Sequence, residues 1–112
     1  VFKEFKGALT EQYVMQELAT KKGIGVYYYT NERSSAEVDF LVDDGEDVIP
    51  VEVKAETNLM AKSLKYYNEK YSPRISVRSS MADYREEGSL LNLPLYAISE
   101  LKEMTSVSQD RS

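Results

Sequence analysis

The sequence contains no cysteine and no histidine among its 112 residues. Without cysteine there can be no disulfide, no thiolate metal site and no cysteine nucleophile. Without histidine there can be no Ser-His-Asp triad, no histidine-ligated zinc and no imidazole acid–base chemistry. Any catalytic site must therefore use carboxylates, lysine, arginine, tyrosine, serine or threonine, and the metal that carboxylates alone can hold is a hard cation such as Mg²⁺.

Long apolar runs are also absent. None approaches the roughly 20 residues that a membrane span needs, and the start at Val1–Glu4 lacks both the apolar core of a signal peptide and an initiator methionine. We therefore expect a cytoplasmic domain without membrane contact, excised from a longer chain.

The residues that are present are those of an ordinary globular protein, 42% hydrophobic and 29% charged. This length suits one domain, which we place at residues 1–104, followed by a disordered polar tail at 105–112. Nineteen acidic and fourteen basic residues give a formal charge of −5. That balance excludes a nucleic-acid binder held by overall positive charge.

Periodicity predicts an α/β fold. Apolar residues at helical spacing indicate helices over 4–21 and 61–71, the second of which is stopped by Pro73. Alternation and β-forming residues predict strands over 24–30, 36–42, 48–54, 74–79 and 93–98, with a loop at 81–92 and a last helical turn through 104. A helix between the third and fourth strands permits a parallel crossover, so the order α-β-β-β-α-β predicts a mixed central sheet flanked by helices.

Glu11 is anomalous because it falls inside the apolar arc of the first helix, between Val14 and Met15 in angle. A carboxylate that faces a core is costly unless it is paired or binds a metal. The alternatives are that the helix is rotated or that Glu11 lies at a wet end of the sheet.

Two strands each carry carboxylates on one face. In 36–42, Glu37 and Asp39 share the face opposite the apolar residues, and in 49–54 the polar face carries Glu52 and Lys54, about 6.6 Å apart along the strand. Either pattern alone is common on a solvated face.

The combination is more specific. Asp43-Asp44-Gly45 carries the Asp-Gly signal of a hairpin turn between these two strands. Hairpin-linked strands bring Asp39 and Glu52 onto adjacent chains. Two carboxylates, a backbone carbonyl and waters can form an oxygen shell for Mg²⁺. Lys54 would then hold the attacking water, and Glu11 would complete the acidic cluster from the covering helix.

This order of motifs resembles the PD-(D/E)XK, or restriction-endonuclease-like, nuclease superfamily. The segments 7–11, 36–40 and 49–55, together with 62–65 and 92–96, are similar to a narrower group. That group is the domain of unknown function that follows the AAA-type ATPase module in many bacterial and archaeal proteins. The resemblance covers roughly residues 5 to 103, although Val38 stands where the superfamily name has proline.

The resemblance implies a restriction-endonuclease-like core that hydrolyses DNA phosphodiester bonds with Mg²⁺ or Mn²⁺. It implies that Asp39 and Glu52, with Glu11, are metal ligands and that Lys54 is the catalytic lysine. As partners it implies DNA, held weakly by the isolated fragment, the N-terminal ATPase domain of the same protein, and a second copy in a homodimer. Because many superfamily members have lost cleavage, the alternative is an inactive module for docking or oligomerisation of the parent ATPase.

Charge is unevenly distributed along the chain. Residues 31–56 hold nine acidic and two basic side chains, whereas residues 61–85 hold six basic and two acidic ones. The basic segment supplies candidate phosphate contacts at Lys62, Lys65, Arg74 and Arg78, although a basic helix face is often simply solvated. No phosphate-binding Gly-x-x-x-x-Gly-Lys-Ser/Thr loop is present, so ATP hydrolysis by this chain is not expected.

Overall fold

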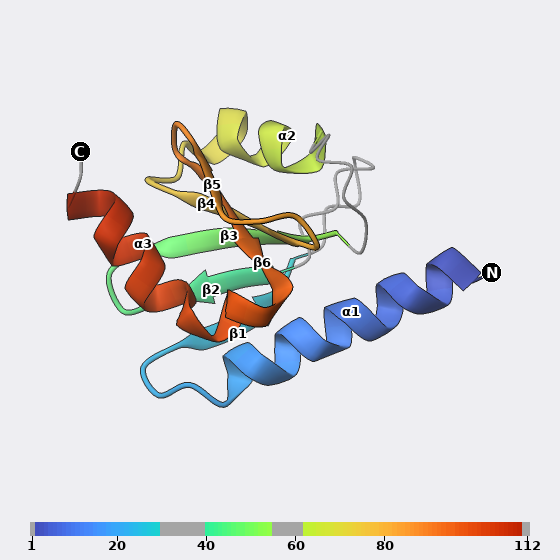
Figure 1. Cartoon of the computed structure of the whole chain (residues 1–112). Helices are drawn as coiled ribbons and strands as arrows, with labels where there is room; N and C mark the ends of the chain where they lie inside the picture. The colour runs from blue at the N-terminus through green and yellow to red at the C-terminus, as the bar shows by residue number, and fades with distance from the viewer. Residues whose placement is uncertain (1, 30–39, 55–61, 111–112) are drawn as a thin grey trace.

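A six-stranded mixed sheet with helices on both faces forms the centre of the computed structural model (Figure 1), which describes residues 2–29, 40–54 and 62–110. The strand order is β1-β2-β3-β4-β6-β5. The predicted fold class, α/β with a mixed sheet flanked by helices, is confirmed at this level.

The first three strands form an antiparallel meander of β1 (Gly25–Tyr28), β2 (Phe40–Asp43) and β3 (Val48–Val53). The predicted Asp-Gly turn joins β2 to β3: the Asp44 carboxylate accepts backbone N–H bonds from Glu46 and Asp47, both at 2.8 Å. Gly45 has φ +94°, which favours glycine.

Helix α2 (Lys62–Tyr71) connects β3 to β4 (Ser76–Ser80), which lies parallel to β3. The connection is the predicted crossover. The chain then forms β5 (Arg85–Glu87) and β6 (Leu90–Pro94), and β6 lies parallel to β4.

This last hairpin corrects two expectations. Residues 81–92 contain β5 and the start of β6 rather than a loop, and the last strand ends at Pro94 rather than at residue 98. The three residues of β5 are all exposed, polar and charged, so their sequence carries no apolar alternation that would indicate a strand.

The two faces of the sheet are covered differently. Helix α1 (Phe2–Ala19), the 3₁₀-helix η1 (Leu95–Glu100) and α3 (Leu101–Asp110) lie together on one face (Figure 1). The main core lies on this side and includes Val14, Leu18, Phe40, Val42, Ile49, Val51, Val77, Leu91 and Leu93. On the other face α2 packs Leu64 and Tyr67 against Leu41 and Leu90.

Helix α3 occupies most of the segment for which the sequence predicted a disordered tail. It runs to Asp110, and the Thr105 side chain is buried, with its hydroxyl donating to the Leu101 carbonyl at 2.9 Å. The prediction of disorder from residue 105 is therefore wrong as far as Asp110. The prediction failed because the segment is polar and its sequence does not show which residues pack inward. The packing of α3 against η1 becomes visible only in the structure. Among the described residues, no helix is both long and apolar enough to cross a bilayer.

Candidate functional site

Glu52 and Lys54 lie at the end of β3, in the middle of the sheet between β2 and β4. Glu52 is only 3% exposed, because strands flank it on both sides. Lys54 Nζ lies 3.7 Å from Glu52 Oε1, and the lysine side chain is 34% exposed. The Lys54 backbone N–H donates to the Ser79 carbonyl at 2.8 Å, which fixes the start of this side chain. The pair therefore connects a buried carboxylate to a surface amine.

Alternation along β3 places Glu52 on the face covered by α2. Its neighbours Val51 and Ile49 belong to the main core on the opposite face, and successive side chains of a strand point to opposite faces. The sequence pattern of 49–54 predicted this separation correctly.

Asp39 lies outside the described residues. Its chain neighbour Phe40 is the first residue of β2 and pairs with Val51, which directly precedes Glu52. The adjacency of β2 and β3, on which the predicted carboxylate pair depends, is confirmed.

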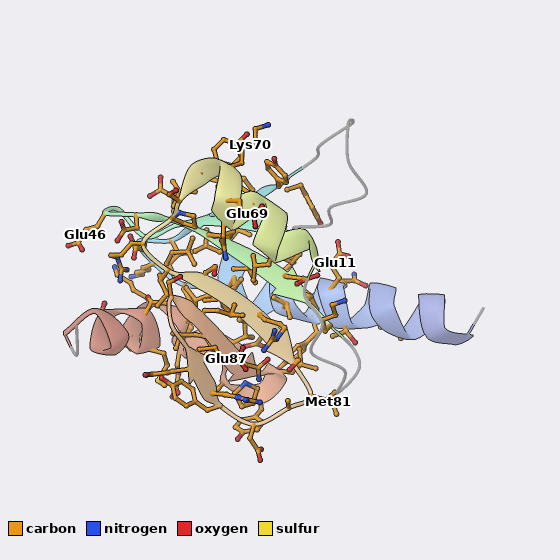
Figure 2. The ribbon with its side chains drawn as sticks, turned by 90° about the horizontal axis from the view of Figure 1, so that it is seen from above. Glu11, Glu46, Glu69, Lys70, Met81 and Glu87 are labelled. Atoms are coloured by element: carbon orange, nitrogen blue, oxygen red, sulfur yellow. The ribbon has the colours of Figure 1, made fainter. Side chains whose placement is uncertain are left out.

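Glu11 lies on α1 in the same helical stripe as the buried residues Val14 and Leu18, but is itself half-buried. The N-terminal half of α1 extends past the sheet (Figure 1), and Figure 2 shows Glu11 on the side where β3 ends. The stripe therefore continues beyond the core, which matches the alternative that Glu11 occupies a wet end of the sheet.

Of the three described candidates Glu11, Glu52 and Lys54, two thus meet: Glu52 and Lys54. Within residues 2–29, 40–54 and 62–110, no three acidic side chains gather into a group that could hold a metal ion. The predicted set requires Asp39, so the described residues contribute only part of it. The carboxylate oxygens of Glu52 are suitable ligands for a hard cation, but a site for one needs a second carboxylate as well.

The predicted phosphate contacts do not form one surface. Arg74 precedes β4, at the edge where the parallel strands begin, and its Nε lies 2.7 Å from Asp47 Oδ2. Arg78 is in the middle of β4 and only 2% exposed. The expectation of a surface phosphate contact is therefore wrong for Arg78. Arg74 and Lys54 lie at opposite ends of the parallel strands β3 and β4. For Lys62 and Lys65 the structure describes the backbone of α2 alone.

A buried polar network beside Glu52 was missed by the sequence analysis. Asn92 on β6 accepts hydrogen bonds from Arg78 Nε at 3.1 Å and from the Ser80 hydroxyl at 2.7 Å. Its amide donates to the carbonyls of Ala82 at 3.1 Å and Asp83 at 2.9 Å. The available signal was an arginine and an asparagine inside apolar strands, where a buried polar side chain needs a partner.

An apolar hollow of about 420 Å³ lies at the edge where β4 and β6 end. Its lining comes from α1, from the residue after β4 and from η1: Leu9, Thr10, Tyr13, Met81, Leu95 and Tyr96. Figure 2 shows Met81 and Glu11 on this same side of the molecule. No local signal in the sequence could reveal the hollow, because three distant segments form it.

The model of one protein family, the domain of unknown function DUF4143, matches residues 6–98. The chain belongs to this family. The match spans Glu11, Asp39, Glu52 and Lys54 and all the strands described above. No curated protein matches the chain, and no solved structure matches it.

Proposed function

We propose that this DUF4143 domain is a metal-dependent nuclease-like domain that hydrolyses DNA phosphodiester bonds. The observation that carries the proposal is the Lys54–Glu52 pair, with its 3.7 Å separation, at the end of a central strand whose neighbour follows directly after Asp39. The element order α1-β1-β2-β3-α2-β4 supports a restriction-endonuclease-like core, which is part of the proposal.

Each residue has a stated role. Asp39 and Glu52 would hold Mg²⁺ or Mn²⁺, which requires the β2–β3 register to continue by one residue beyond Phe40 and Val51. Glu11 would approach from α1. When bound, the ion supplies a water of lowered pKa and offsets charge on a phosphate oxygen. Lys54 donates to the attacking water and orients it, and its exposure lets it do so at the surface.

The substrate and the larger assembly follow from the family resemblance. DNA is proposed as the substrate, and an AAA-type ATPase module of the same protein as the neighbour that delivers it. A second copy of the domain is proposed as a further partner. A domain of net charge −5 needs such help, because its own field repels phosphate at long range.

Cleavage of labelled single-stranded, duplex and branched DNA by the purified domain, in Mg²⁺, Mn²⁺ or EDTA, tests the proposal. We expect cleavage that requires the ion and that Asp39→Asn abolishes. The matched control is Asp43→Asn, whose carboxylate accepts the Gly45 N–H at 2.9 Å in the hairpin turn. Equal cleavage by wild type and Asp39→Asn, or none by wild type on any substrate, contradicts the proposal.

A second candidate is an inactive nuclease-fold module for docking or oligomerisation of the ATPase. The low exposure of Glu52 favours it, because Lys54 can then serve only to offset a buried charge. Under this alternative Lys54→Met lowers the free energy of unfolding while nucleic-acid processing by the full-length protein is unchanged.

A further inference from the structure

Three buried polar side chains form a row across the parallel strands. Glu52 on β3 pairs in register with Arg78 on β4, and Arg78 pairs with Asn92 on β6. Register partners on parallel strands point to the same face, so all three lie on the side covered by α2. Their exposed fractions are 3%, 2% and 1%. The proposed reaction assigns no role to Arg78 or Asn92.

Asn92 fixes the position of Arg78. Its carbonyl oxygen accepts two hydrogen bonds and its amide donates two, which uses the full capacity of the side chain. Rotation of Asn92 would break all four. The guanidinium of Arg78 is therefore anchored at Nε within the row, one strand away from Glu52.

Arg78 brings a permanent positive charge into the interior, since a guanidinium does not lose its proton in proteins. A buried cation is costly unless an anion lies nearby. Glu52 is its register partner, and Lys54 stands 3.7 Å from the same carboxylate on the other side. Lys54 thus lies within ion-pair distance of Glu52, and Arg78 stands beside Glu52 as its register neighbour, with Nε bonded to Asn92. Asp39 would raise the number of carboxylates to two, equal to the number of these cations.

Such a balance weakens the attraction for a divalent cation, because fixed positive charges near the ligands repel it. A substrate phosphate restores the missing negative charge. Mg²⁺ is commonly held by one or two carboxylates together with substrate phosphates.

We propose that Arg78, anchored by Asn92, is a positioning residue that offsets the charge of Glu52, so that the site takes a divalent cation more tightly together with a substrate phosphate than alone. This inference rests on the proposed function. It assigns to Arg78 a role inside the protein in place of the surface phosphate contact expected from the sequence.

The test is a titration with Mn²⁺, followed by the electron paramagnetic resonance signal of the free ion, which does not depend on turnover. The domain is measured alone and with a phosphorothioate DNA oligonucleotide that resists cleavage, and binding by the oligonucleotide alone is subtracted. We expect the affinity of wild type for Mn²⁺ to rise about tenfold or more with the oligonucleotide.

Arg78→Met should bind Mn²⁺ about tenfold more tightly than wild type when no oligonucleotide is present. Arg74→Met is the matched control. It removes the same charge at the other end of the parallel strands and should leave the affinity for Mn²⁺ unchanged. A merely structural arginine would give weaker or equal binding on removal. Circular dichroism verifies that both variants fold. The comparison of wild type with and without the oligonucleotide tests the proposal even if a variant does not fold.

The outcomes separate the two claims. Wild type that binds Mn²⁺ equally well with and without the oligonucleotide overturns the inference and leaves the proposed function standing. Unchanged or weaker affinity in a folded Arg78→Met variant overturns the role of Arg78. Absence of Mn²⁺ binding in both conditions overturns the proposed function itself.

Discussion

The sheet carries an ion pair at each end of its parallel strands, and the two pairs differ. Where the strands begin, Arg74 Nε donates to Asp47 Oδ2 at 2.7 Å, and both side chains are partly exposed to a similar degree. Where β3 ends, Lys54 lies 3.7 Å from a carboxylate that is almost completely buried. The first pair is short and symmetric in exposure, and the second is longer and asymmetric.

This difference indicates different uses. A short hydrogen-bonded pair between the residues that precede β3 and β4 joins two strand starts and leaves neither charge buried. A longer pair holds a buried carboxylate whose amine partner reaches the surface. A buried carboxylate is costly unless a cation lies beside it, so this end of the sheet keeps a charge that the fold alone does not need. The comparison therefore favours the β3 end as the functional one.

The largest expected effect is on the rate of DNA cleavage, which should distinguish the two ion pairs. Under the proposed function, Lys54→Met should lower the rate of metal-dependent DNA cleavage by about 10²-fold or more, because the attacking water loses its orienting donor. Arg74→Met removes the cation of the other pair and should change the rate little. Rates from single-turnover cleavage, with folding verified by circular dichroism, provide the measurement; comparable losses in both variants would show that the two ends do not differ in function.

The next largest effect concerns the network behind Glu52. Asn92→Ala should lower the free energy of unfolding by about 3 kcal/mol, because buried groups on Arg78 and Ser80 and two backbone carbonyls lose their partner. Asn68→Ala is the matched control: it removes one half-buried hydrogen bond, to Ser76 at 3.1 Å, and should cost about 1 kcal/mol. Urea unfolding curves compare the two, and similar losses would argue against a special role for Asn92.

A smaller effect belongs to the turn at the opposite end. Burial raises the pKa of Asp44, but backbone hydrogen bonds from Asp47 and Glu46 and the charges of Arg74 and Lys102 outweigh it and hold that pKa below its ordinary value. A lowered pKa means that the carboxylate stabilises the fold above its ordinary pKa of 3.8 and that this contribution disappears as the pH falls through the folded pKa.

Asp44→Asn should therefore unfold more easily than wild type at pH 7, by about 1 kcal/mol, and the difference should shrink in acid. Urea midpoints measured from pH 7 down to the acid range provide the test. Asp43→Asn, at an exposed neighbouring carboxylate, is the control. A difference that grows as the pH falls would contradict the assignment.

The smallest effect is the coupling between Arg74 and Asp47. A double-mutant cycle with Arg74→Met and Asp47→Asn should give a coupling of at most about 1 kcal/mol, reduced further in high salt, because both side chains are partly solvated. A coupling that is larger and independent of salt would show that this pair is not a surface clamp.

Much of the fold could be predicted from local patterns. The alternation of Ile49, Val51 and Val53 against Glu52 and Lys54 fixes which residues share a face, and the Asp-Gly pair identified the β2–β3 turn. The helix before β4 gave the parallel crossover. These features depend on neighbours within a few residues, so the sequence displays them directly.

The failures arose where exposure depends on distant segments. Arg78 belongs to a basic stretch in the sequence, yet it lies on β4 between β3 and β6 and is buried. The segment after residue 104 looks like a tail until its contact with η1 is known. Charge along the chain indicates a surface only when the fold leaves that face uncovered.

The sequence alone determined the chemical inventory: with neither histidine nor cysteine, a site here must consist of carboxylates, lysine, arginine, tyrosine, serine or threonine. It also determined that Glu52 and Lys54 stand on one face of a strand, because the side-chain period of a strand is two. Only the tertiary structure decided that Glu52 is buried and that Arg78 is its register partner. It also decided that Glu11 lies where α1 passes the end of the sheet. Those relations come from packing between segments far apart in the chain, which no local pattern encodes.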